Sequence, residues 1–223
     1  LWDHTVINSP KSYWAYNNRG QIFELRKQFD LALADYRQCI RLNPNYARTY
    51  KNIAPYYERE GNITAAIESY SRAIILKPKY KEAYNNRGLL YQSQGDFAAA
   101  LSDFENAITA DPQYALGYLN RGSLYFQMKE FENALADLTQ AIALKPADSK
   151  SYLSRIKCYL NMNLFKEAVE DCQTALKLND LSPQEKSLCS LVEQKARSGI
   201  NENLLMKEPL NPDDYNNRGQ IYG

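Results

Sequence analysis

YNNRGLLYQSQGDFAAALSDFENAITADP, residues 84–112, carries the pattern from which the fold can be predicted. Its first five residues also occur at Tyr16–Gly20 and at Tyr215–Gly219, and the first two copies begin 68 residues apart. That distance is twice a spacing of 34 residues, which separates the members of a proline series: Pro10, Pro44, Pro78, Pro112 and Pro146. A fixed spacing of this length indicates a structural repeat.

The 34-residue unit aligns five times, and the copies are numbered from the N-terminus: repeat 1 (13–46), repeat 2 (47–80), repeat 3 (81–114), repeat 4 (115–148) and repeat 5 (149–182). Position 4 is Tyr in every copy, position 11 is aromatic and position 20 is Ala. These residues resemble the tetratricopeptide repeat, whose pattern of aromatic and small residues ends with A-x3-F and a Pro. Repeat 3 meets that pattern with Tyr84, Gly88, Tyr91, Ala100, Phe104 and Pro112.

The resemblance implies an all-α fold, a right-handed superhelical solenoid of antiparallel helix pairs. We expect four segments: a partial helix of a preceding repeat over 1–12, five repeats over 13–182, a degenerate sixth repeat or capping helices over 183–211, and the truncated first helix of a further repeat over 212–223. In the third segment, Ser182 as N-cap and Glu185 at the third helical position predict a helix over 183–198.

Position 7 holds an unexpected charge, because Arg stands there where the family usually has Leu. At about 100° per residue, positions 4, 7, 8 and 11 share the arc that faces the second helix, where an Arg needs a partner. Asp at position 23 supplies it in four repeats, whereas repeat 2 has Ile53 and Ser69 instead. We therefore predict four structural ion pairs: Arg19–Asp35, Arg87–Asp103, Arg121–Asp137 and Arg155–Asp171.

The opposite arc of each first helix is expected, from the resemblance, to line a concave groove. Position 6 on that arc is an amide in four repeats, forming a ladder of Asn18, Asn52, Asn86 and Asn120. The ladder resembles the Asn row in the repeats of O-GlcNAc transferase, and such amides can bond the backbone of an extended peptide. The alternative is that they bond neighbouring helices or water.

The other groove positions differ along the chain. Repeat 2 has a cationic group, Arg48, Lys51 and Arg59, which suits an acidic segment. Repeats 4 and 5 have an apolar group edged by a cation, Leu116, Leu119, Phe126, Leu153 and Lys157. The alternatives are a solvated charged face and apolar contacts with a neighbouring helix.

Pro55 lies inside the expected first helix of repeat 2, where it removes the usual hydrogen bond to the Lys51 carbonyl. We expect a local distortion there, which either opens the groove beside Lys51 or has no role.

Composition argues against several function classes. The 223 residues contain 27 Lys and Arg against 26 Asp and Glu, so no global field attracts nucleic acid. No apolar run approaches the length of a membrane span, and we expect no direct membrane contact. Four Cys without a CxxC motif and one His form no zinc framework, and nucleotide-binding motifs are absent, so we expect no metal and no cofactor. We expect the Cys to be reduced, which favours a cytoplasmic location.

We interpret the chain as a non-catalytic scaffold that binds an extended segment of an unknown protein or peptide in the concave groove. The alternative is the substrate-recognition arm of a larger glycosyltransferase, membrane-bound or not. Both ends are interpreted as cuts through a longer array, each lacking the helix that the other has. Weak head-to-tail self-association of the isolated chain is therefore expected.

Overall fold

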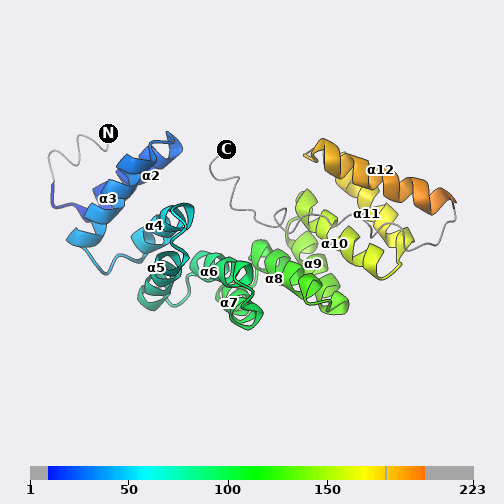
Figure 1. Ribbon diagram of the computed structural model, residues 1–223, viewed down its shortest axis with the longest axis horizontal. Coiled ribbons are helices and arrows are strands. Elements are labelled where there is room, and N and C mark those ends of the chain that lie inside the picture. Colours follow the sequence, from blue (N-terminus) through cyan, green and yellow to red (C-terminus); the bar gives the residue numbers. More distant parts are fainter. Residues whose placement is uncertain (1–9, 179, 199–223) are drawn as a thin grey trace. The chain divides into compact units, whose positions relative to one another are not determined.

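The computed structural model describes residues 10–178 and 180–198, and all regular secondary structure in that part of the chain is α-helical (Figure 1). The chain divides into two compact units between residues 110 and 111. Unit 1 contains α2 (Tyr13–Leu25), α3 (Phe29–Leu42), α4 (Ala47–Arg59), α5 (Ile63–Leu76), α6 (Lys81–Ser93) and α7 (Phe97–Ala110). Unit 2 contains α8 (Ala115–Gln127), α9 (Phe131–Leu144), α10 (Ser149–Asn161), α11 (Phe165–Lys177) and α12 (Pro183–Ser198).

Helices that are adjacent in sequence pack as antiparallel pairs joined by short turns. In unit 1 the pairs are α2 with α3, α4 with α5, and α6 with α7, and α3 and α5 also contact the next pair. In unit 2 the pairs are α8 with α9 and α10 with α11, and α12 covers α11. The all-α prediction of successive helix pairs is therefore confirmed.

A left-handed residue ends the first helix of each pair. Gly61 and Gly95 take φ of 74° and 78° after α4 and α6. The equivalent residues of the other repeats take the same conformation without being glycine: Lys27, Lys129 and Asn163. The turn geometry is thus kept in all five repeats, even where the residue disfavours it.

Close approach of the paired helices explains the small residue at position 8. A Cβ added to Gly88 would lie 2.9 Å from the Phe104 ring, and one added to Gly20 would lie 2.7 Å from the Tyr36 ring. Repeat 5 reverses the sizes, with Ile156 at position 8 and Cys172 on α11, both fully buried in one core cluster. In repeat 5 the larger side chain therefore comes from the first helix and the smaller one from the second, which conserves the combined volume of the two.

The predicted helix over 183–198 is present as α12. Its N-terminus is a reciprocal cap, in which the Ser182 N–H donates to Glu185 Oε2 at 2.7 Å and the Glu185 N–H donates to Ser182 Oγ at 3.3 Å. The expected terminal segments, 1–12 and 212–223, lie outside the described residues except for 10–12.

Pro55 does not delay or interrupt its helix. The α4 helix runs continuously from Ala47 to Arg59 with Pro55 inside it, and it has the same 13-residue length as α6 and α8. Its core-facing residues, Ile53, Ala54 and Tyr56, are buried on either side of the proline. Tertiary packing therefore holds the helix together where its local sequence disfavours it.

In the part of the chain that the structure describes, no helix combines the length and the apolar composition needed to cross a membrane.

Candidate functional site

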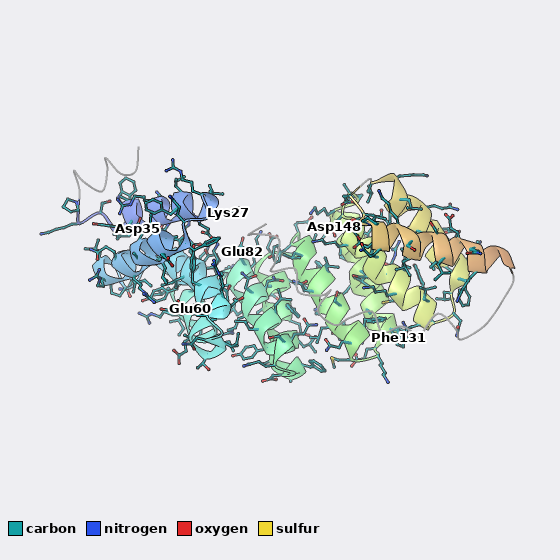
Figure 2. All side chains as sticks on the ribbon, turned by 45° about the horizontal axis from the view of Figure 1, so that its top comes forward. Lys27, Asp35, Glu60, Glu82, Phe131 and Asp148 are labelled. Carbon is teal, nitrogen blue, oxygen red and sulfur yellow. The ribbon has the colours of Figure 1, made fainter. Side chains whose placement is uncertain are left out.

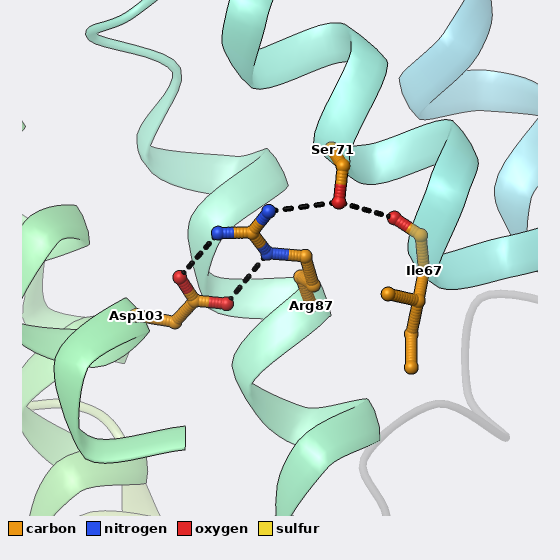
Figure 3. Close-up of polar contacts among 4 residues, drawn as sticks. All are labelled: Ile67, Ser71, Arg87 and Asp103. Atoms are coloured by element: carbon orange, nitrogen blue, oxygen red, sulfur yellow. Dashed lines mark hydrogen bonds and ion pairs between the residues drawn. The ribbon is translucent and has the colours of Figure 1, made fainter. Parts of the chain in front are cut away.

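The four Arg–Asp pairs expected from the sequence are all formed, each between the two helices of one repeat. In repeat 3 both contacts are hydrogen bonds of 2.8 Å, from Arg87 Nε and Nη2 to the two carboxylate oxygens of Asp103 (Figure 3). The guanidinium carbon also lies 5.8 Å from the ring centroids of Tyr84 and Tyr91. Constant aromatic positions 4 and 11 thus flank the ion pair.

Two of these pairs also contact the preceding repeat, which the sequence reasoning missed. Arg87 Nη1 donates to Ser71 Oγ on α5 at 2.8 Å, and Ser71 Oγ donates to the Ile67 carbonyl at 2.7 Å (Figure 3). Arg155 Nη1 likewise donates to Thr139 Oγ1 on α9 at 3.0 Å. The sequence signal for this contact is a Ser or Thr 16 residues before the Arg, here Ser71 and Thr139.

Electrostatics agree with a structural role for the pairs. The hydrogen bond to Asp103 raises the pKa of Arg87, so the guanidinium stays charged. Burial raises the pKa of Asp103, and the charge of Arg87 opposes that rise. The guanidinium is engaged on three sides, which leaves it little capacity for a ligand.

The asparagines of position 6 are engaged within unit 1 rather than presented freely. Asn52 is 5% exposed and donates to Asn17 Oδ1 at 3.2 Å, while Asn86 Nδ2 donates to the Tyr70 hydroxyl at 3.4 Å. Asn18 accepts from Asn17 Nδ2 at 3.3 Å. The bonds of Asn52 and Asn86 match the alternative in which the amides bond neighbouring helices, whereas Asn18 bonds a residue of its own helix.

Position 5 contributes buried amides that the sequence reasoning did not single out. Asn17 is fully buried, and its Oδ1 also accepts from Thr49 Oγ1 at 3.1 Å. Thr49 Oγ1 in turn lies 2.9 Å from Cys39 Sγ. The chain of contacts joins α2, α3 and α4, so the first Asn of YNNRG has a packing role. The remaining asparagine of position 6, Asn120 in unit 2, is 6% exposed.

The apolar group of repeats 4 and 5 lies largely in the cores of unit 2. Leu119 and Leu153 are 5% and 6% exposed and belong to core clusters, and the ring centroid of Phe126 lies 5.6 Å from that of Phe131 on α9. The prediction that these residues form an open apolar groove is therefore wrong for Leu119 and Leu153. Leu116 is 38% exposed, and Lys157 is partly buried on α10.

The cationic group of repeat 2 separates into two places. Arg59 is exposed, and its guanidinium stacks over the Phe29 ring of α3 at 4.1 Å from the centroid. Arg48 and Lys51 instead line a cavity of about 640 Å³ in unit 1. Their side chains come from the first two turns of α4, which begins at Ala47.

The cavity gathers groups from four helices and two loops. From α2 comes Gln21, from the α3–α4 loop come Asn45 and Tyr46, and from the end of α5 comes Leu76. The α5–α6 loop adds Lys77 and Tyr80, and the start of α6 adds Glu82, whose position is labelled in Figure 2. Lys77 Nζ lies 4.3 Å from the Tyr80 ring centroid. We call this site the Lys51 cavity.

Charge in the Lys51 cavity is unbalanced. Three cations, Arg48, Lys51 and Lys77, face one carboxylate, Glu82, and among the described residues no salt bridge joins any of the three to an acid. Burial lowers the pKa of Lys51, while Glu24 and Glu82 act in the opposite direction. Burial also raises the pKa of Tyr80 to about 12. Within residues 10–178 and 180–198, no cluster of His, Cys, Asp and Glu is arranged to hold a metal ion.

Comparisons with known proteins agree with the helix pairing. A family model described as tetratricopeptide repeat matches residues 13–46, 82–114 and 115–148, and one described as TPR repeat matches residues 56–95. Together these matches cover more than half of the chain. No curated protein matches it.

Solved structures show the same fold. The chain is similar to MamA at 26% identity and a TM-score of 0.64, over 80% of this chain and 96% of that one. It is similar to TTC0263, a thermophilic TPR protein in Thermus thermophilus, at 21% identity and a TM-score of 0.64, over 82% of this chain and 100% of that one. YrrB, described as a TPR protein with an unusual peptide-binding site, is similar at 13% identity and a TM-score of 0.65, over 87% and 98%. The family matches and these folds, together with the helix pairs, place the chain in the tetratricopeptide repeat family.

Proposed function

We propose that this chain is a non-catalytic protein-interaction scaffold that binds an extended protein segment along the groove side of its first helices. Tetratricopeptide repeats generally serve as interaction modules, and neither family model that matches describes an enzyme. The observation that supports the proposal most strongly is the Lys51 cavity. Its volume of about 640 Å³ is within the range of ligand pockets, roughly 300–1,000 Å³.

The position of the cavity also supports this function. It is lined from α2, α4 and α6, the first helices of three successive repeats, through Gln21, Lys51 and Glu82. A segment that crosses successive first helices can contact all three, as expected for recognition of an extended chain. Arg–Asp pairs join α2 and α6 to their partner helices, and none of the paired residues lines the cavity.

The test is selection of random nine-residue peptides, displayed on phage, against the full 223-residue chain. Bound peptides should protect backbone amides of α2, α4 and α6 from hydrogen exchange more than those of α3, α5 and α7. Absence of any enriched peptide, or protection confined to the second helices, would contradict the proposal.

A matched control separates the groove from general charge. The double change Arg48→Glu/Lys51→Glu alters two cations of the cavity, whereas Arg37→Glu/Arg41→Glu makes the same change in charge on α3, at two exposed residues. We expect the first variant to lose the selected peptides and the second to retain them. Equal loss in both would indicate non-specific attraction.

A further inference from the structure

The charges of the Lys51 cavity indicate the chemistry of what it binds. Arg48, Lys51 and Lys77 line one open volume, and the carboxylates that act on Lys51, Glu82 in the lining and Glu24 on α2, offset only part of the three positive charges. The surplus is local, because the whole chain has a net charge of only +1. Burial lowers the pKa of Lys51 and Arg48 adds to that lowering, while Glu24 and Glu82 oppose it.

The start of α4 adds to the same surplus. An α-helix carries a partial positive charge at its N-terminus, which an acidic residue in the first turn usually offsets. The first turn of α4 has no acidic residue and contains Arg48 instead. The helix end and the three side chains therefore all favour an anionic group in the cavity.

The walls of the cavity fit a side chain attached to a peptide better than a free ion. Tyr46, Ala47, Leu76 and Tyr80 provide apolar surface, and Gln21 provides an amide that can bond a peptide backbone. A volume of about 640 Å³ far exceeds that of a small anion. The carboxylate of Glu82 also disfavours a doubly charged group, because it repels the second negative charge.

We propose that the Lys51 cavity receives an Asp or Glu side chain of the bound protein segment, with Lys51 as the central cation and Arg48 and Lys77 at its sides. This inference rests on the proposed function and names the chemistry of its partner. Each of the three cations gains a charge-assisted hydrogen bond that it lacks in the described part of the free chain.

The experiment uses the peptides selected on the full chain. Each enriched peptide is synthesised in three forms that differ at one acidic position: the carboxylate, the corresponding amide, and phosphoserine. We expect an acidic residue to be enriched at a fixed position, and its amide form to bind at least ~10-fold more weakly, as the strength of hydrogen bonds to charged groups predicts. Isothermal titration calorimetry measures the three dissociation constants.

Variants connect this preference to the cavity. Lys51→Met should remove most of the difference between carboxylate and amide, and Lys51→Glu should select peptides with Lys or Arg at the same position. Arg48→Gln provides a second test at an exposed residue if a Lys51 variant fails to fold, which circular dichroism reports. The α3 variant Arg37→Glu/Arg41→Glu should keep the carboxylate preference.

The outcomes separate the two proposals. Peptides that protect α2, α4 and α6 without an acidic preference would overturn this inference and leave the scaffold function standing. Tighter binding of phosphoserine than of carboxylate would also overturn it, in favour of a phosphorylated partner. If no peptide is enriched, the proposed function itself fails, and the inference fails with it.

Discussion

Repeats 2 and 3 are neighbours in unit 1 and pack their helix pairs with different residues at three consecutive positions. Repeat 3 has Arg87, Gly88 and Leu89 on α6, and repeat 2 has Ile53, Ala54 and Pro55 on α4. Repeat 3 buries an ion pair between its helices, whereas repeat 2 replaces both partners, with Ile53 and Ser69. The Ser69 hydroxyl donates to the Ala65 carbonyl of its own helix at 2.8 Å.

The difference shows that the Arg and the Asp can be replaced together by uncharged residues without loss of the helix pair. A charge pair can be exchanged for uncharged residues when both members change together, but a lone half-buried charge is unfavourable. Repeat 2 has no such pair and instead carries Lys51, whose charge no salt bridge in the described residues neutralises. We therefore interpret the arginines of position 7 as structural and Lys51 as the better candidate for binding.

The largest effect that would test this comparison comes from breaking one pair. Asp103→Ala leaves the Arg87 guanidinium half-buried without its bidentate partner, so we expect the free energy of unfolding to fall by about 3 kcal/mol. The double variant Arg87→Ile/Asp103→Ser, which copies repeat 2, should lie within about 1 kcal/mol of the wild type. Urea unfolding followed by circular dichroism measures both. A loss in the double variant as large as that of Asp103→Ala would mean that the two residues are not coupled.

The next effect concerns the proline of α4. Pro55→Ala restores the N–H that the helix interior lacks, so we expect the free energy of unfolding to rise by about 2–3 kcal/mol. Leu89→Ala, at the equivalent position of α6, should have the opposite sign because it removes a buried side chain. The same urea experiment compares the two. Destabilisation by Pro55→Ala would show that the proline ring packs productively in α4.

A smaller effect tests the close approach of α6 and α7. Gly88→Ala places a Cβ 2.9 Å from the Phe104 ring and 3.2 Å from Asp103 Cβ, and we expect a loss of about 1–2 kcal/mol despite the better helix propensity of Ala. In repeat 2 the position is already Ala54, and Ala54→Gly should lose about 1 kcal/mol through lower helix propensity. A neutral or stabilising Gly88→Ala, measured by thermal unfolding, would contradict the tight contact.

The smallest effect lies in the turns. Lys129 has φ of 64° where repeat 3 has Gly95, so Lys129→Gly relieves backbone strain, offset in part by the greater freedom of glycine in the unfolded chain. We expect a gain of about 0.5–1 kcal/mol. Gly95→Ala should lose a similar amount from conformation alone, since no atom lies within 4 Å of the added Cβ. Differential scanning calorimetry resolves shifts of this size, and equal signs for both variants would refute the explanation.

Periodicity made most of the fold predictable from this sequence. Tyr at position 4, Ala at position 20 and the recurring prolines specify the same helix pair five times, so local and tertiary preferences agree. The helix at 183–198 was predictable for a local reason, because Ser182 and Glu185 cap each other within one turn. The Arg–Asp partners were predictable because both members change together in repeat 2.

Burial on the groove arc was decided by tertiary structure. Helical angle places Lys51, Leu119 and Asn17 on the same arc, yet Lys51 lines a cavity, Leu119 enters a core and Asn17 bonds its neighbours. The angle describes one helix, whereas exposure depends on how closely the adjacent helices and loops approach it. Helical angle also does not determine where the charges of Arg59 and Lys77 lie. The Arg59 guanidinium lies over the Phe29 ring of α3, and Lys77 lines the cavity from the loop before α6. The sequence by itself therefore determined the repeat, its helix pairs and its buried ion pairs, while packing between successive pairs decided which polar groups remain available to a partner.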